Sequence, residues 1–236
     1  MNQVKFSASL SCIELGHIEK SIHLLNNLNI DEFHYDVVDG KFNDCFIFGD
    51  ICLKEFRKHS EIPITVHLAC EDPLPYIKPL IKNGATGIAI HYESKVDIIT
   101  TLKLLRSYNV QPILAFKDCT DVPDDFLYLA KYANKIIKLT VQPGFSGQKL
   151  NSIALKHIKK MRTILNQNHI YIPIEADGNI CYKTMPKCLK AGADCFTLGS
   201  SGLFNKKNSL ENNLKELKEI GEIYYAHNLQ QKNNDM

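Results

Sequence analysis

The chain has 236 residues, of which 44% are hydrophobic and 23% are charged, with a formal net charge of +2. This composition excludes a disordered polar chain, and the near-neutral balance gives no reason to expect a nucleic acid or an anionic membrane as partner. The length suggests one or two domains, and a single α/β barrel of about 250 residues falls within that range. We therefore expect a globular protein with a large core.

The N-terminal segment MNQVKFSASLSC lacks a basic region followed by a long apolar run. No apolar stretch approaches the roughly 18 residues that a membrane span requires. These features predict a cytoplasmic protein. The eight cysteines include no CxxC pair, so we expect them to stay reduced in that compartment and to act as small apolar residues.

Short runs rich in β-branched and aromatic residues alternate with longer segments of helical apolar spacing. Two of the helical segments are Ile18–Leu28 and Asp97–Tyr108, in which apolar residues recur on one face. A last helix is predicted at Leu210–Tyr225. The predicted strands are, in chain order, Val4–Leu10, Glu32–Val38, Ile64–Ala69, Gly87–His91, Gln111–Phe116, Ile136–Val141, Ile172–Ala176 and Cys195–Leu198.

Each predicted helix returns the chain to a new strand, and Gly84 and Gly192 stand where helices end before strands. Strict alternation of strand and helix implies a parallel sheet. Eight units of about thirty residues favour a closed (β/α)8 TIM barrel over an open sheet. We expect one barrel domain at residues 1–226 and a frayed polar tail at residues 227–236.

In such a barrel the chemistry lies where the strands end. His34 and Asp36 share a face of the second strand, because residues two apart in a strand point the same way. The third strand ends near His67 and the seventh near Asp177. Each residue alone would be a buried polar group. Four of them at equivalent strand ends predict one divalent metal ion, Zn²⁺, Fe²⁺, Mn²⁺ or Co²⁺, which would compensate two buried carboxylates.

Glycine-rich turns follow the sixth, seventh and eighth predicted strands, at Pro143–Gln148, Asp177–Asn179 and Gly199–Gly202. One such turn would be ordinary turn chemistry, but three on adjacent strands favour a phosphate held by backbone N–H groups. Together with a metal they favour a sugar phosphate as substrate. Asp36 and Asp177 could then move protons on opposite faces of an enediolate and invert the carbon next to the carbonyl.

Six segments stand in matching order and spacing between Lys5 and Asn205: Ala8–Leu10, His34–Gly40, His67–Leu68, Gln142–Gln148, Asp177–Gly178 and Gly199–Phe204. In these segments the chain resembles the ribulose-phosphate 3-epimerase family, including its branch that acts on D-allulose 6-phosphate. The resemblance implies a TIM barrel of the ribulose-phosphate-binding type. It also implies an isomerase of carbohydrate and pentose phosphate metabolism that works as a homo-oligomer on a phosphorylated ketose.

The resemblance also assigns roles to residues. Asp36 and Asp177 would be the acid/base pair, and the favoured reaction would convert D-ribulose 5-phosphate to D-xylulose 5-phosphate. The implied metal ligands are His34, Asp36, His67 and Asp177. The implied contacts to substrate or its phosphate are Ser9, His67, Gly144, Phe145, Ser146, Gly147, Gly178, Asn179, Gly199 and Ser200.

The chain departs from the family at three methionine positions, which read Val38, Ala69 and Leu139. Smaller or stiffer side chains there would reshape the pocket and remove sulfur contacts. Asn179 and the run Ser201–Asn205 look closer to the allulose 6-phosphate branch than to the pentose branch. Epimerisation of D-allulose 6-phosphate to D-fructose 6-phosphate, another ketose phosphate, or a non-catalytic sugar-phosphate-binding paralogue are therefore alternatives.

A different class of enzyme is also conceivable, because Asp39–Asp44 matches the Asp-x-Lys-x-x-Asp array of barrel decarboxylases and aldolases. That array begins past the predicted strand end, so a polar loop is the better interpretation. A sugar-phosphate sensor would have little need for two carboxylates beside a metal. His91 and Lys117, which end the fourth and fifth strands, could line the site or simply lie at the rim.

Overall fold

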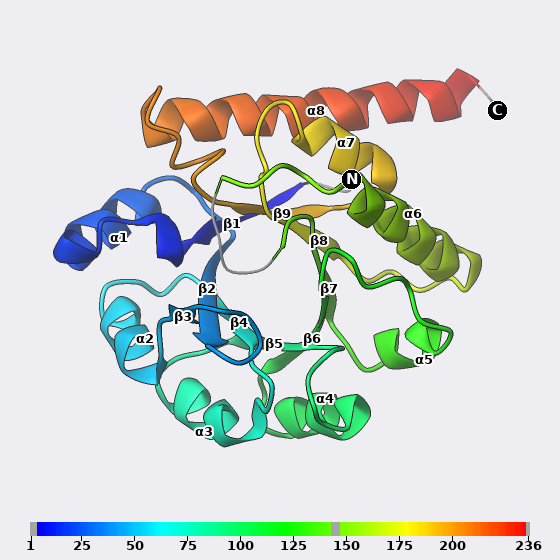
Figure 1. Cartoon of the computed structure of the whole chain (residues 1–236). Helices are drawn as coiled ribbons and strands as arrows, with labels where there is room; N and C mark the ends of the chain where they lie inside the picture. Colours follow the sequence, from blue (N-terminus) through cyan, green and yellow to red (C-terminus); the bar gives the residue numbers. More distant parts are fainter. Residues whose placement is uncertain (1–3, 143–146, 235–236) are drawn as a thin grey trace.

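The structure, a computed structural model, describes residues 4–142 and 147–234. Eight parallel strands form a closed barrel, because β1 pairs with β9 on one side and with β2 on the other. This confirms the predicted (β/α)8 fold (Figure 1). The barrel strands are β1 (Lys5–Ser9), β2 (Glu32–Asp39), β4 (Ile64–Ala69), β5 (Gly87–His91), β6 (Gln111–Phe116), β7 (Lys135–Leu139), β8 (Ile174–Asp177) and β9 (Cys195–Leu198).

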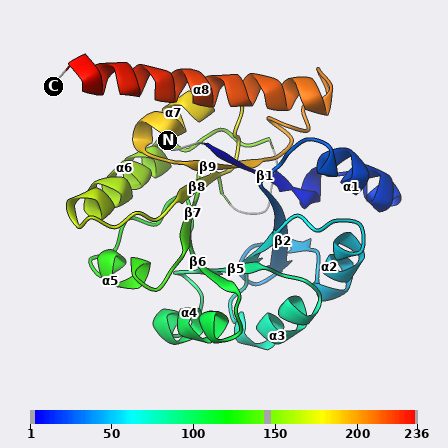
Figure 2. The ribbon, with the colours of Figure 1, turned by 180° about the vertical axis from the view of Figure 1, so that it is seen from behind.

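Helices surround the barrel, as seen from both ends in Figures 1 and 2. They are α1 (Ile18–Asn26), α2 (Asp50–Arg57), α3 (Leu74–Lys82), α4 (Ile98–Ser107), α5 (Phe126–Ala130), α6 (Ser152–Gln167), α7 (Met185–Ala191) and α8 (Leu210–Asn234), with 3-10 turns at Leu10–Cys12 and Leu15–His17. None of the helices in the described part of the chain is long and apolar enough to cross a membrane.

The helices begin and end where local chemistry directs. Asp97 caps α4, since its carboxylate accepts the N–H of Thr100 at 2.6 Å. Gly192 ends α7 with a φ of 107°, a left-handed conformation that a glycine adopts without steric cost. On α4, Leu102 and Leu105 are fully buried against the barrel. The predicted alternation of helix and strand therefore follows from caps and apolar faces.

The C-terminal helix α8 differs from expectation, because it continues to Asn234 instead of ending at Tyr225. After Gly221 the chain has neither glycine nor proline up to that point, so nothing in the segment breaks the helix. The domain boundary predicted after residue 226 thus falls inside α8.

An additional short strand, β3 (Phe46–Ile47), pairs antiparallel with the end of β2. The chain turns back after β2 at Gly40, which has a φ of 71°, and the ring of Phe46 lies over this glycine. The sequence predicted only a loop here. As a result, the loop after β2 folds over the end of the barrel where the parallel strands finish.

Candidate active site

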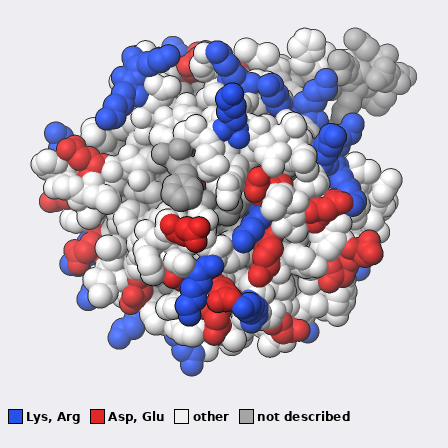
Figure 3. All heavy atoms as spheres, in the orientation of Figure 1, with Lys and Arg blue, Asp and Glu red and all other residues white. Residues whose placement is uncertain are grey.

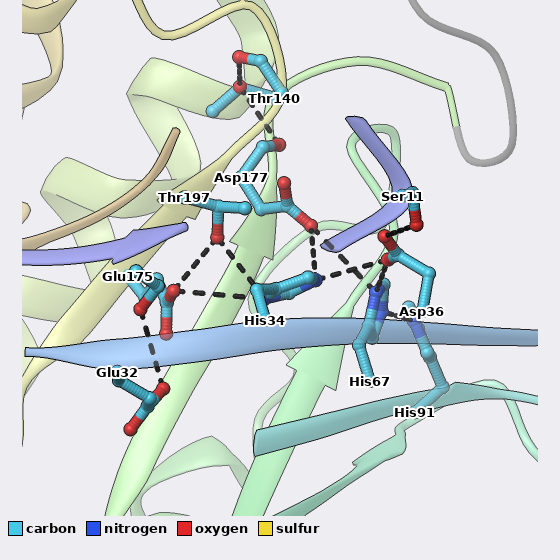
Figure 4. A network of polar contacts seen from close by, with 12 residues as sticks. Ser11, Glu32, His34, Asp36, His67, His91, Thr140, Glu175, Asp177 and Thr197 are labelled. Atoms are coloured by element: carbon cyan, nitrogen blue, oxygen red, sulfur yellow. Dashed lines mark hydrogen bonds and ion pairs between the residues drawn. The ribbon is translucent and has the colours of Figure 1, made fainter. Parts of the chain in front are cut away.

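The four predicted metal ligands come together at the carboxyl ends of the strands, inside the barrel (Figure 4). Asp36 on β2 stands opposite His67 on β4 in the strand register. His34 lies two residues before Asp36 on the same inward face, and Asp177 ends β8. One donor atom from each of the four lies within 4.8 Å of the others.

The donor atoms belong to two imidazoles and two carboxylates. Asp36 Oδ1 lies 3.1 Å from His34 Nε2 and 3.1 Å from His67 Nδ1. Asp177 Oδ2 lies 3.4 Å from the same nitrogen of His34 and 3.8 Å from that of His67. Two nitrogen and two oxygen donors that face one point are a ligand set for Zn²⁺, Fe²⁺, Mn²⁺ or Co²⁺. The residues present therefore fit a divalent transition metal.

The charges of the cluster drive its pKa values in opposite directions. Burial favours neutral His34, yet the carboxylates of Asp177 and Asp36 raise its pKa well above the ordinary value. Burial would raise the pKa of Asp36, but the two histidines hold it well below the usual range. The pKa of Asp177 is raised, first by burial and then by the charge of Asp36. One carboxyl group thus favours the anion while the other retains a proton more readily.

His34 is supported from below by residues that the sequence interpretation did not assign. Its Nδ1 lies 3.3 Å from the hydroxyl of Thr197, which in turn donates to Glu175 Oε1 at 2.8 Å. Glu175 is fully buried, and its Oε2 lies 2.6 Å from Lys135 Nζ, which also pairs with Glu32. Burial alone would raise the pKa of Glu175, but the charge of Lys135 lowers it. Glu175 lies two residues before Asp177 on the same strand, so the alternation of side chains in a strand was the signal that could have placed it on the inward face.

His67 is supported by His91, which the sequence left open as a residue of the rim. The Nε2 atoms of the two rings lie 2.7 Å apart, and His91 Nδ1 lies 2.9 Å from Glu93 Oε2. Burial lowers the pKa of His91 to about 4, while hydrogen bonds from its neighbours lower that of Glu93 to about 2 in spite of burial. Lys117 Nζ lies 3.8 Å from the centre of the Phe42 ring and not within the cluster. His91 thus lies behind His67 instead of lining the site.

The other predicted contact residues lie at the same end of the barrel. Ser9 is buried on β1 and stands opposite His34 in the register. Gly178 and Asn179 follow β8 with φ values of 116° and 50°, and Gly199 and Ser200 follow β9. Gly147 has a φ of 81°. The predicted contacts Gly144, Phe145 and Ser146 lie outside the described residues.

Two further side chains at this end were missed by the sequence interpretation. Ser11 follows β1 and donates its hydroxyl to Asp36 Oδ2 at 2.8 Å, so both oxygens of this carboxylate have protein partners. Thr140 follows β7 and donates to the carbonyl of Asp177 at 3.1 Å, which ties two adjacent strand ends together. Neither residue belongs to a pattern visible in one sequence, because both contacts cross between strands.

The surface around the barrel mouth carries charges of both signs. Figure 3 shows acidic and basic side chains interspersed around this end of the molecule, with basic side chains along the edge where α8 lies. The side chains of Asp36 and Asp177 are 20% and 15% exposed, so they face the mouth instead of the closed core. A small polar molecule can therefore reach them from this side.

Comparison with known proteins decides the family. The sequence profile of the ribulose-phosphate 3 epimerase family matches residues 5–204. The chain belongs to this family. Ribulose-phosphate 3-epimerase from Methanocaldococcus jannaschii is 29% identical over 216 residues, covering 92% of this chain and 90% of that protein. The enzyme of the same name from Aquifex aeolicus is 34% identical over 195 residues, covering 80% and 84%.

Membership of the ribulose-phosphate 3-epimerase family makes the chain an isomerase, as its resemblance to the family implied. Solved structures extend the likeness in fold alone. The 3-hexulose-6-phosphate synthase of Salmonella typhimurium has a TM-score of 0.66 at 14% identity, covering 93% of this chain and 99% of that one. Phosphoribosyl anthranilate isomerase from Thermococcus kodakaraensis has a TM-score of 0.63 at 14% identity, covering 92% and 98%.

Proposed function

We propose that this chain is a metal-dependent 3-epimerase of a ketose phosphate, with the interconversion of D-ribulose 5-phosphate and D-xylulose 5-phosphate as the favoured reaction. The observation that carries the proposal is the convergence of His34, Asp36, His67 and Asp177 within 4.8 Å at the open end of the barrel. The two curated relatives described above carry the name of this pentose phosphate activity.

His34, Asp36, His67 and Asp177 would hold one Zn²⁺, Fe²⁺, Mn²⁺ or Co²⁺ ion. When bound, such an ion supplies Lewis acidity, which makes the proton next to a carbonyl easier to remove. The protein fixes the donors in advance, since each histidine is hydrogen-bonded on the ring nitrogen that faces away from the cluster. The donor set is thus preorganised.

Asp36 and Asp177 would carry out the proton transfers. Their strands are separated around the barrel by β1 and β9, so the two carboxyl groups reach the cluster from different sides. The lowered pKa of Asp36 suits a base, and the raised pKa of Asp177 suits an acid. One would take the C3 proton from the ketose, the other would return a proton to the opposite face of the enediolate, and the reverse reaction would exchange their roles. The product is the C3 epimer.

The turns after β7, β8 and β9 would hold the phosphate through backbone N–H groups. Gly178 and Asn179 provide two consecutive left-handed residues, and Gly199 and Ser200 open the next turn. The sequence pattern adds four residues to these proposed phosphate contacts: Gly144, Phe145, Ser146 and Gly147. The family resemblance also underlies our proposal that the protein is a homo-oligomer, and the sequence features described above underlie our proposal that it is cytoplasmic.

A hexose phosphate is the second candidate substrate, favoured by the residues that replace the family methionines. All three replacing residues are buried. Val38 and Ala69 lie two residues after Asp36 and His67, on the same inward faces of β2 and β4, and Leu139 stands opposite Asp177 in the pairing of β7 and β8. Val38 and Ala69 are shorter than methionine, which leaves more room beside the cluster. Epimerisation of D-allulose 6-phosphate to D-fructose 6-phosphate is the corresponding reaction.

The proposal is tested by NMR in D₂O with protein reconstituted with one divalent metal. We expect the C3 hydrogen of ribulose 5-phosphate to exchange as the epimer forms, and Asp177→Asn to reduce this rate by about 10²- to 10⁴-fold. Allulose 6-phosphate is measured in parallel, and the substrate with the higher kcat/KM identifies the branch. Exchange of neither substrate by a metal-loaded wild type would overturn the epimerase proposal for both sugars.

A control is needed because the described residues hold a second group with metal-ligand chemistry. It consists of Glu19 and His23, exposed on α1, and the half-buried His59 after α2. Metal stoichiometry should be measured in a His23→Ala, His59→Ala double variant. We expect this variant to bind one metal ion and to keep wild-type activity, since its substitutions lie outside the barrel. Loss of activity in the double variant would contradict the assignment of the metal to the barrel.

A further inference from the structure

A line of three polar side chains runs from the cluster to the β6–α5 connection. His67 Nδ1 faces Asp36, and its Nε2 lies 2.7 Å from His91 Nε2. On the other side of the His91 ring, Nδ1 lies 2.9 Å from Glu93 Oε2. The two rings are tilted by 36° with centroids 4.9 Å apart, so the contact is made edge to edge by nitrogens. Figure 4 shows His91 next to His67.

His91 and His67, in the middle and at the inner end of this line, are shielded from water. His91 is fully buried and His67 is 4% exposed. The Phe42 ring lies 4.6 Å from the His91 ring between centroids, and Lys117 Nζ lies on Phe42. Because water does not reach His91, its two nitrogens must be satisfied by His67 and Glu93.

The hydrogen bonds of Glu93 show that it acts as an acceptor toward His91. Glu93 Oε1 accepts the backbone N–H of Lys117 at 2.8 Å and the hydroxyl of Thr120. This connection is itself anchored, since the buried Lys138 donates from Nζ to the carbonyls of Lys117 and Thr120 at 2.5 and 2.6 Å. A carboxylate only accepts hydrogen bonds, so Glu93 Oε2 takes the proton of His91 Nδ1.

With a metal ion at the cluster as the partner of His67 Nδ1, only one proton arrangement then satisfies both rings. With its proton on Nδ1, His91 presents a lone pair at Nε2. His67 Nε2 must carry the proton that fills this contact, which leaves the lone pair of His67 on Nδ1. That nitrogen is the one that faces Asp36 and Asp177.

We propose that His91 and Glu93 are positioning residues that hold His67 in the tautomer whose Nδ1 can ligate the metal. The inference rests on the proposed metal site and adds to it the pair of residues that prepares one ligand. A carboxylate or carbonyl behind a ligating histidine is a common device. Here His91, which does not ligate the metal, stands between the Glu93 carboxylate and His67. Glu93 therefore determines the tautomer of His67 without contacting it.

Glu93→Gln is the most informative variant, because it preserves the shape of the side chain and replaces an acceptor oxygen by an amide donor. If the glutamine carbonyl keeps the hydrogen bonds from Lys117 and Thr120, its amide N–H₂ points at His91 Nδ1. His91 would then carry its proton on Nε2, facing the N–H of His67, and His67 would have to place its proton on Nδ1. We expect Zn²⁺ affinity, measured by competition with a chelator, to fall by about 10- to 100-fold.

His91 allows a matched pair of variants. Gln can present its carbonyl near the position of Nε2, so His91→Gln should accept the His67 proton and keep Zn²⁺ affinity within about threefold of wild type. Phe has no acceptor, and His91→Phe should weaken binding by about tenfold or more. His157→Gln, at a buried histidine of α6 outside this line, is the control and should leave the affinity unchanged.

The tautomer is read directly from the side-chain ¹⁵N spectrum of the Zn²⁺-loaded wild type, which does not depend on any variant folding. We expect a proton on His67 Nε2 and on His91 Nδ1. A proton on His91 Nε2, or wild-type Zn²⁺ affinity in both Glu93→Gln and His91→Phe, would overturn this inference and leave the metal site intact. A wild-type protein that binds neither Zn²⁺ nor Co²⁺ would overturn the metal site and this inference together.

Discussion

Asp36 and His67 stand opposite each other in the parallel pairing of β2 and β4, and Asp36 Oδ1 lies 3.1 Å from His67 Nδ1. The contact depends on strand register, since a slip of one residue would turn one of the two side chains to the outer face. His34, two residues before Asp36, reaches the same carboxylate oxygen with Nε2. The site is therefore built from the pairing of strands and not from a single contiguous motif.

The ion pair below the cluster should contribute strongly to stability. Lys135 neutralises Glu175, whose side chain is fully buried and whose Oε1 accepts a hydrogen bond from the hydroxyl of Thr197. Lys135→Met leaves that buried carboxylate without the lysine that neutralises it, so we expect the free energy of unfolding to fall by about 3–5 kcal/mol. Urea denaturation measures it. Adding Glu175→Gln should restore at least half of the loss, and a loss below about 1 kcal/mol in the single variant would contradict this role.

His91 should make the metal-free protein sensitive to mild acid. Its pKa is about 4 in the folded chain against 6.5 ordinarily, so below pH 6.5 the unfolded chain binds a proton that the folded chain does not. The contribution of His91 to the free energy of unfolding therefore decreases as pH falls from about 6.5 to about 4, by up to about 3 kcal/mol.

The measurement for this prediction is urea denaturation of metal-free wild type and His91→Gln at several pH values between 7 and 4.5. The difference between the two proteins isolates His91 from the other titrating groups of the cluster. Wild type should lose stability relative to the variant toward the acid end. Parallel curves over this range would show that the folded protein protonates His91 as readily as the unfolded chain does.

Alanine substitutions at two turn glycines should distinguish an effect on backbone strain from an effect on phosphate binding. At Gly178 a Cβ would lie 2.4 Å from Val141 Cγ2, and the φ of 116° is unfavourable for alanine, so Gly178→Ala should cost about 1–3 kcal/mol of stability. At Gly199 the nearest atom to an added Cβ is Cys12 Sγ at 3.5 Å, an ordinary contact. Gly199→Ala should keep its stability but raise KM for the phosphorylated ketose about tenfold. An unchanged KM would remove Gly199 from the phosphate site.

The sequence predicted the parts of the fold that are determined locally. The predicted bounds of Ile64–Ala69 and Gly87–His91 agree with β4 and β5, since both are continuous apolar runs buried on each face. The four metal-ligand candidates were identifiable because each ends or lies near the end of such a strand. Their convergence follows from closure of the barrel, which the strict alternation of strand and helix already implied.

Features that depend on distant partners could not be predicted in the same way. Ser11 meets Asp36 only because η1, the 3-10 turn at Leu10–Cys12, brings it across from β1 to β2. Glu175 is explained by Lys135 on the neighbouring strand, and β3 exists only as a partner for the end of β2. In each case the information is in the pairing of strands, which has no local signature in one chain.

The positions that replace the family methionines should determine the choice of substrate. Val38 and Ala69 stand opposite each other in the β2–β4 pairing, and Leu139 stands opposite Asp177, so all three lie next to the cluster. A triple variant with methionine at each position fills space beside the cluster. We expect kcat/KM for D-allulose 6-phosphate to fall at least about tenfold relative to that for D-ribulose 5-phosphate. Ile137→Met, deeper on β7, is the control and should leave the ratio unchanged. An unchanged ratio in the triple variant would show that substrate size is selected elsewhere, at the phosphate turns.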